Sequence, residues 1–183
     1  MNTFKPVLTE YIDQEDCHTL PFYKSIGGYT ALEKVLTMNP EDVTQEVKDS
    51  NLRGRGGAGF STGMKWGFIP KDSNKPKYLI NNADESEPGT FKDRLLMNKA
   101  PHQMLEGMII AAYAIGCNTS FIYIRGEFYQ EYKLLEQTIA EAYDNNILGQ
   151  NILGSNYSLD IVNHRGAGAY ICGEETALIA SIE

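Results

Sequence analysis

Strand-like apolar segments alternate with helical segments along most of this chain of 183 residues. Segments 77–81, 119–125 and 159–162 are rich in β-branched and aromatic residues, a composition typical of buried strands. Apolar residues recur at helical spacing over 101–115 and 129–145. Strands separated by helices of this length predict βαβ units. We therefore expect an α/β fold with a parallel sheet and flanking helices.

The two ends of the chain differ from this regular middle. Residues 1–28 carry prolines and paired glycines without a clear period, and they predict an extended N-terminal arm. We place the α/β domain at 29–183. Thr30 followed by Glu33 has the spacing of a capping box and predicts a helix start. The last helical pattern, from Glu174, runs to the final residue without a stop signal, so we expect this domain to be incomplete at its C-terminus.

Composition excludes several functional classes. A net charge of -8 argues against nucleic-acid binding, which needs a basic surface. No apolar run approaches the ~20 residues needed to span a bilayer, and the N-terminus lacks the pattern of a signal peptide. The three cysteines are widely spaced, which fits neither a disulfide framework nor a cluster site. These features predict a cytoplasmic protein without direct membrane insertion.

A glycine-rich loop is the most unusual stretch of the sequence. Glycine permits positive φ and lets a ligand approach backbone N–H groups, so such a loop beside cations can hold phosphate. The loop matches G-x-G-x-x-G, but it follows no strand, and the ordinary dinucleotide fingerprint therefore fails its structural requirement. Its residues are Gly54, Arg55, Gly56, Gly57, Ala58, Gly59 and Phe60, with Lys65 shortly after.

Polar and glycine-rich segments follow all three predicted strands. They are 82–89, Gly126-Glu127 and 164–175. In open α/β sheets, ligands bind outside the carboxyl ends of the strands. The convergence of these segments predicts a ligand site at that edge of the sheet.

The carboxylates in these segments allow more than one interpretation. Asp84, Glu85 and Glu87 resemble a divalent-metal site, but composition alone favours a solvated acidic turn ahead of a helix. They could instead accept hydrogen bonds from ribose or a flavin ring. Glu174 and Glu175 at a helix start are also explained by the helix dipole.

Aromatic residues near the loops are similarly ambiguous. Phe60, Phe68 and Tyr170 are either core residues or stacking surfaces for an adenine or nicotinamide ring. His18 and His102 have no partner at metal-ligand spacing, so we assign no metal. Ser61 lacks the surroundings of a nucleophile elbow, which leaves hydrolase chemistry unsupported.

Three long motifs carry a family resemblance. Residues 52–60, 82–94 and 165–178, with Lys65-Trp66 between the first two, together resemble the flavin-carrying subunit of respiratory complex I. This is the 51-kDa or F subunit of NADH:quinone oxidoreductase, and its relatives include diaphorase subunits of NAD-linked hydrogenases and formate dehydrogenases. The resemblance runs from about residue 25 to the end of the chain. Ser61 stands where the family usually has proline, a small departure.

The resemblance implies a modified Rossmann-like FMN domain, truncated before the family's ubiquitin-like and iron–sulfur helical domains. FMN would accept a hydride from NADH and pass electrons singly to iron–sulfur clusters toward quinone, with no catalytic side chain. The glycine loop would approach both ligands through its N–H groups. The residues implied to bind FMN are Lys65, Asn82, Asp84, Glu85, Gly173 and Glu174. Phe60 and Phe68 would stack on the adenine of NADH, Glu87 and Glu175 would contact its ribose or nicotinamide, and Tyr170 belongs to the same cofactor site.

The implied partners are NADH and other peripheral-arm subunits of complex I, especially a 24-kDa-type 2Fe-2S subunit. The protein would be peripheral to the inner membrane, and a 4Fe-4S cluster is expected only in the missing C-terminal part. As this fragment alone, we expect weak or absent FMN binding and no catalysis. The alternatives are a diaphorase subunit, a noncatalytic scaffold of the same fold, and a generic phosphate-binding domain, which the absence of G-K-[ST] disfavours.

Overall fold

A three-stranded parallel sheet forms the centre of the computed structural model, which describes residues 5–70, 73–170 and 174–183. Strands β1 (Tyr78–Ala83), β2 (Thr119–Ile124) and β3 (Asp160–Arg165) lie in the order β1-β2-β3. Each pairs in parallel with its neighbour over six residues. The predicted strands and the predicted parallel sheet are confirmed.

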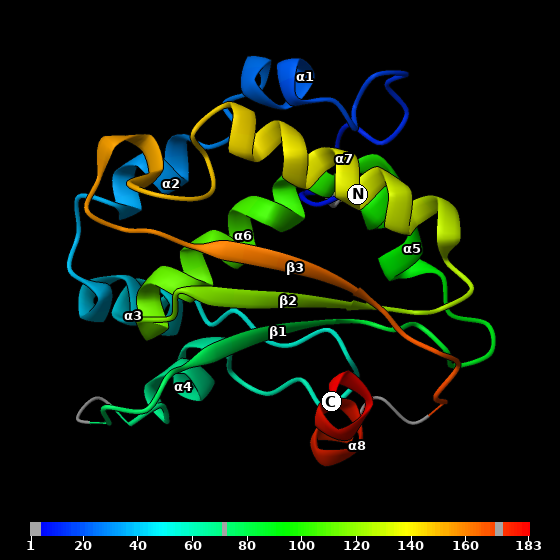
Figure 1. Cartoon of the computed structure of the whole chain (residues 1–183). Coiled ribbons are helices and arrows are strands. Elements are labelled where there is room, and N and C mark those ends of the chain that lie inside the picture. The colour runs from blue at the N-terminus through cyan, green and yellow to red at the C-terminus, as the bar shows by residue number, and fades with distance from the viewer. Residues whose placement is uncertain (1–4, 71–72, 171–173) are drawn as a thin grey trace.

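Helices lie mainly on one face of this sheet. The two long crossover helices are α6 (Pro101–Ile115) and α7 (Tyr129–Asp144), and α8 (Glu175–Ile182) lies on the opposite face (Figure 1). α6 ends where Gly116 adopts a left-handed conformation, φ 69°, which glycine reaches without strain. The remaining helices are α1 (Leu20–Ser25), α2 (Thr30–Val35), α3 (Pro40–Asp49), α4 (Thr62–Gly67), α5 (Lys92–Lys99) and the 3₁₀ turn Ile152–Gly154.

The two faces of β2 meet different partners because strand side chains alternate. Ile122 and Ile124 are fully buried in the main core with residues of α6 and α7. Tyr123 faces the other way, packs against Leu178 of α8, and its hydroxyl lies 2.6 Å from that of Ser181. The main core thus lies between the sheet and the α5–α7 layer, and α8 covers part of the second face.

The N-terminal segment differs from the predicted extended arm. Residues 20–25 form helix α1, whose N-cap Thr19 accepts a hydrogen bond from the N–H of Phe22. Leu20 is buried in the main core. This segment is therefore partly helical because Leu20 packs into the domain, while the domain boundary after residue 28 stays a prediction.

A buried carboxylate, rather than the predicted capping box, begins α2. Thr30 is the first helical residue, and its hydroxyl donates to the carbonyl of Gly27. The Glu106 side chain on α6 accepts hydrogen bonds from the N–H groups of Tyr29 and Leu32, each at 3.0 Å, and from the Tyr23 hydroxyl. A long-range partner thus satisfies the free donors that a local side chain was expected to satisfy.

His102 also lies on α6 and, like Glu106, contacts Tyr29. Its surroundings predict that the stability of the fold depends on pH. Its Nδ1 lies 2.9 Å from the Tyr29 hydroxyl and its Nε2 lies 3.2 Å from Glu141 Oε2. A neutral ring with its proton on Nε2 satisfies both contacts. Burial lowers the pKa of His102 below its ordinary value, although the hydrogen bond to Glu141 opposes this.

We expect the free energy of unfolding to decrease as pH falls below about 6.5, where the unfolded chain binds a proton that the folded state resists. Denaturant titrations between about pH 5 and 7 should show a shallower pH slope in His102→Gln. His164→Gln serves as the control. If His102→Gln keeps the full slope, this histidine is not the source of the pH dependence.

In the part of the chain that the structure describes, no helix is both long and apolar enough to cross a membrane.

Candidate functional site

The carboxyl ends of the three strands meet at one edge of the sheet, as the sequence predicts. The strands run further than expected at β1 and β3, so Asn82 lies within β1, and His164 and Arg165 lie within β3. The loops after β1 and β3 leave the sheet on this same side (Figure 1). This edge brings together the segments 82–89, 125–128 and 165–170.

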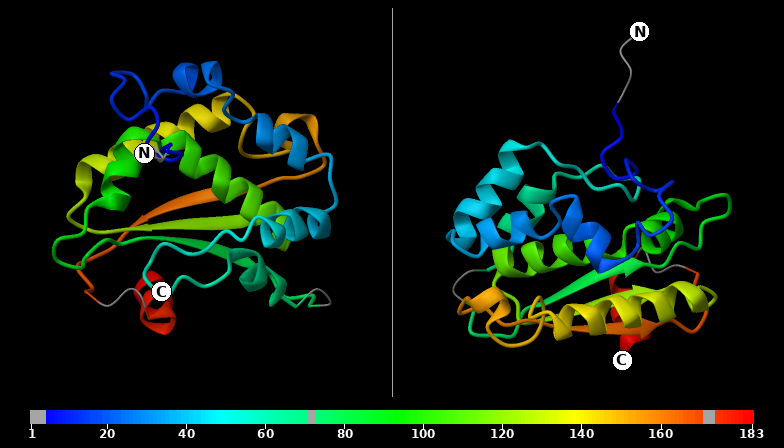
Figure 2. Two further views of the ribbon diagram at one scale, coloured as in Figure 1. Left: turned by 180° about the vertical axis from the view of Figure 1, so that it is seen from behind. Right: turned by 90° about the horizontal axis from the view of Figure 1, so that it is seen from above.

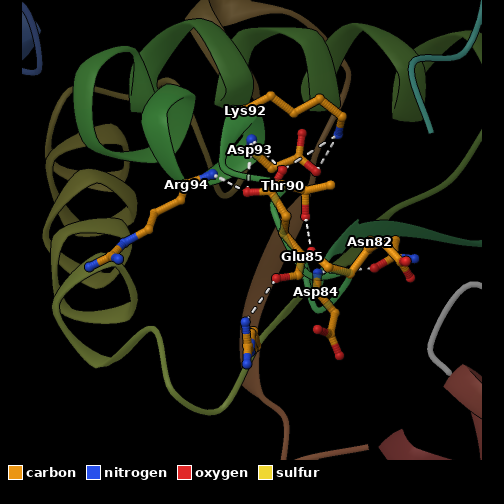
Figure 3. A network of polar contacts seen from close by, with 9 residues as sticks. Asn82, Asp84, Glu85, Thr90, Lys92, Asp93 and Arg94 are labelled. Carbon is orange, nitrogen blue, oxygen red and sulfur yellow. Dashed lines mark hydrogen bonds and ion pairs between the residues drawn. The ribbon is translucent and has the colours of Figure 1, made fainter. Parts of the chain in front are cut away.

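The Glu85 carboxylate is held at the start of α5 (Figure 3). It accepts hydrogen bonds from the backbone N–H of Asp93 at 3.0 and 3.2 Å and from that of Arg94 at 3.1 Å, and it is only 5% exposed. Lys92 Nζ lies 3.9 Å from it. These bonds satisfy the free donors of a helix N-terminus. Glu85 is thus committed to shaping the loop, and its contact with FMN stays a prediction.

The neighbouring polar residues have separate partners. Asn82 Oδ1 accepts from the N–H of Asp84 at 3.0 Å, and Asp84 Oδ1 accepts from the Ser86 hydroxyl. Glu87 Oε2 accepts from the Tyr170 hydroxyl at 3.0 Å, and this hydrogen bond raises the pKa of Tyr170. The hydrogen bond between Glu87 and Tyr170 therefore joins the loops after β1 and β3.

The glycine loop is a closed hairpin-like turn. The N–H of Gly54 donates to the carbonyl of Phe60 at 2.9 Å, and Arg53 Nη1 donates to the carbonyl of Gly59 at 3.2 Å. Gly57 and Gly59 have positive φ, 108° and 61°. Among the described residues, the backbone N–H groups of 55–59 have no hydrogen-bond acceptor. An exposed turn with five free N–H groups has the donors that an anionic ligand needs.

Helix α4 follows the glycine loop and carries Lys65. Ser61 is the N-cap, and its hydroxyl accepts from the N–H of Met64, which gives the departure from proline a local role. Lys65 is exposed and makes no ion pair or hydrogen bond within the described ranges. A lysine free of protein carboxylates is available to an anion.

Phe60 and Phe68 come together at this end of α4. Their ring centroids lie 6.0 Å apart with an interplanar angle of 50°, and the rings are 48% and 66% exposed. Such exposure rules out the core interpretation. The two rings contact each other and present their outer faces to solvent.

The glycine loop lies on the β1 side of the sheet, whereas α7 lies over the β3 side (Figure 2, right). Between described residues, no hydrogen bond or ion pair joins residues 54–60 to 82–89 or 165–170. The prediction that the glycine loop and the strand ends share one ligand therefore stays a prediction.

The third motif is described only in part. Glu174 is the N-cap of α8: its carboxylate accepts from the N–H of Ala177 at 2.8 Å and from the Thr176 hydroxyl. These hydrogen bonds lower the pKa of Glu174. Gly173 lies outside the described residues, and Glu175 is placed only as the first residue of α8.

Two arginines that sequence reasoning missed tie the strand-end loops together. Arg125 Nη1 donates to the carbonyl of Glu85 at 3.1 Å, and Arg165 Nε donates to the carbonyl of Gly126 at 2.8 Å. A side chain at Gly126 would meet the carbonyl oxygen of Gly166 at 2.4 Å, so these loops touch through bare backbone. The available signal was the position of each arginine at a strand end, directly before a glycine.

Fold and site together define an α/β domain. Its glycine-loop N–H groups and Lys65, which have no partner among the described residues, and its strand-end loops suit an anionic nucleotide-like ligand. The match to known proteins is more specific. The chain belongs to the family described as the Nuo51 FMN-binding domain, whose model matches residues 47–183.

Relatives with high identity support this assignment. The chain is 56% identical over 181 residues to the second F-type subunit of NADH-quinone oxidoreductase from Rhizobium meliloti (strain 1021), covering 98% of this chain and 43% of the relative. It is 53% identical over 169 residues to the F-type subunit of the same enzyme from Rickettsia bellii (strain OSU 85-389), covering 92% of this chain and 40% of the relative. The chain thus spans about two fifths of the length of these curated relatives.

A solved structure shares the fold. The crystal structure of an NAD+-reducing [NiFe]-hydrogenase in the H2-reduced state matches with a TM-score of 0.74 and 37% identity. The match covers 97% of this chain and 28% of that chain. The predicted resemblance to the complex I subunit and its hydrogenase relatives is confirmed.

Proposed function

We propose that this chain is the FMN-binding part of an NADH dehydrogenase flavoprotein subunit, which oxidises NADH and delivers electrons toward quinone. The single observation that carries the proposal is the glycine loop: within the described residues its five backbone N–H groups have no acceptor, and Lys65 on the helix that follows makes no ion pair or hydrogen bond. The chain that carries this loop is 56% identical to the Rhizobium meliloti protein, which is named as a subunit of NADH-quinone oxidoreductase. When bound, FMN supplies the hydride-accepting group.

The residues present fit a flavin mononucleotide. The phosphate would be held by Lys65 and by N–H groups of 55–59, because a charged donor and oriented backbone dipoles favour an anion. A Cβ placed at Gly56, Gly57 or Gly59 would meet no atom within 4 Å, so a ligand can approach this backbone directly. Asn82, Asp84 and Glu174 would supply hydrogen bonds from the strand ends.

The NADH site lies beside the flavin in this proposal. The exposed outer faces of Phe60 and Phe68 would stack on the adenine, and Glu87 and Glu175 would accept from ribose hydroxyls or contact the nicotinamide. A carboxylate accepts more than one hydrogen bond, so Glu87 can accept from the ligand while it keeps its bond from Tyr170. Orientation is the work of these side chains, and none is needed as an acid or base.

The named relatives are subunits of NADH-quinone oxidoreductase, and the structural neighbour is a hydrogenase. We infer that the natural partners are other subunits of a multi-subunit oxidoreductase, with a 24-kDa-type 2Fe-2S subunit as the neighbour and a peripheral place at the membrane. The 4Fe-4S cluster would lie in polypeptide beyond this sequence. A hydrogenase diaphorase is the second candidate, favoured by the structural match alone.

Lys65→Met tests the proposed FMN contact. In the natural polypeptide that carries this sequence, purified in its native assembly and stripped of flavin, we expect the Kd for FMN to rise about tenfold, because one charge-assisted phosphate contact is lost. Quenching of flavin fluorescence measures the Kd. Lys133→Met on α7 is the control, since that ammonium lies over the Tyr129 ring, 5.2 Å from its centroid. Equal Kd values for both variants would contradict the assignment.

A further inference from the structure

Arg125 links the end of β2 to the acidic loop that follows β1. Its Nη1 donates to the backbone carbonyl of Glu85 at 3.1 Å, and its backbone N–H donates to the carbonyl of Ala83 at 3.4 Å. One residue therefore holds the start of this loop at two points. A guanidinium is rigid and always charged, which suits it to fix a backbone carbonyl in place.

Three further contacts fix the guanidinium of Arg125. Glu127 accepts from its Nε at 3.2 Å and from its Nη2 at 3.5 Å. The Phe128 ring lies below it, with the guanidinium carbon 5.4 Å from the ring centroid. Because the forked side chain is fixed on two sides, it has little freedom to follow a moving loop.

The same contacts continue around the strand-end edge. Arg165 donates to the carbonyl of Gly126, next to Arg125, at 2.8 Å. In the loop after β3, the Tyr170 hydroxyl donates to Glu87 Oε2, in the loop after β1, at 3.0 Å. The loops after β1, β2 and β3 thus form a closed ring of contacts. Arg125 supplies the contact between the loop after β2 and the loop after β1.

We propose that Arg125 is a positioning residue that fixes residues 84–89 so that Asp84 and Glu87 face the ligand of the strand-end site. This inference rests on the proposed FMN function. Glu85 holds the same loop from the opposite side, because its carboxylate is bonded to the N–H groups of Asp93 and Arg94 (Figure 3). Arg125 binds the backbone carbonyl of Glu85, and α5 binds its carboxylate, so both groups of Glu85 are fixed. The loop is therefore held in place before a ligand binds.

The test compares Arg125→Gln and Arg125→Lys with Glu106→Gln in the natural polypeptide in its native assembly. Glu106 is a matched control: it is 7% exposed and accepts from the N–H groups of Tyr29 and Leu32 at 3.0 Å, but it has no bond to the strand-end loops within the described residues. Its loss destabilises the fold without touching residues 84–89. Three readouts are needed: thermal unfolding, amide hydrogen exchange over 84–90 without flavin, and the Kd for added FMN.

We expect Arg125→Gln to speed exchange over 84–90 and to raise the Kd for FMN about tenfold, with Arg125→Lys in between. Glu106→Gln should lower the unfolding temperature while leaving the Kd within about twofold of the original. A Kd within twofold in Arg125→Gln, with the original protein binding FMN, would overturn the positioning role alone. Failure of the original protein to bind FMN would overturn the proposed function and this inference together.

Discussion

Replacing Glu106 by alanine should lower the free energy of unfolding by about 3–5 kcal/mol. Glu106 is 7% exposed, and its carboxylate accepts from the N–H groups of Tyr29 and Leu32 and from the Tyr23 hydroxyl. The substitution leaves three donors without an acceptor, and each buried unsatisfied donor costs about 1–3 kcal/mol. Urea titration of the purified protein measures the change.

Glu136→Ala is the matched control for this prediction. Glu136 is an exposed glutamate within α7, so its removal should change the free energy of unfolding by no more than about 0.5 kcal/mol. Similar small losses in both variants would show that α1 and α2 are held to α6 by their apolar contacts rather than by the Glu106 carboxylate.

Replacing Gly57 by valine should raise the Kd for FMN about 100-fold in the natural polypeptide. Gly57 has φ 108°, a conformation that a β-branched residue does not adopt without strain. The glycine loop must therefore change its backbone path, which turns the N–H groups of 55–59 away from the proposed position of the phosphate. Fluorescence titration of the flavin-free protein gives the Kd.

Gly107→Val separates this local effect from any general effect of losing a glycine. Gly107 is an exposed residue inside α6, where a Cβ would meet no atom within 4 Å. There the expected change in FMN affinity is less than about twofold, with a change in stability of about 0.5 kcal/mol. If Gly57→Val binds FMN as tightly as Gly107→Val, the glycine loop does not hold the flavin.

Periodicity was enough to predict the sheet and its long crossover helices. The strand segments alternate with helices that begin at Pro101 and Tyr129, and those signals are local to each segment. The start of α2 could not be predicted in the same way. Its free N–H groups are satisfied by Glu106, more than seventy residues away, and no local pattern carries that partner.

The same distinction applies to the site. The glycine loop and the acidic loop were visible as motifs, whereas the contacts that join the strand-end loops were not. Arg125 reaches a backbone carbonyl of residue 85, and a carbonyl has no signature in the sequence. Glu85 was predicted as a ligand contact, but its spacing to the N-terminus of α5 also suits a helix cap, which is the role seen in the structure.

The visible absorption spectrum of the natural polypeptide, purified in its native assembly, is the decisive measurement of the proposed function. We expect flavin bands that are bleached when NADH is added without air, and that are lost together with bound FMN in Gly57→Val. A folded protein that carries no flavin and takes none up from added FMN, or one whose flavin bands do not change with NADH, would overturn the proposed function.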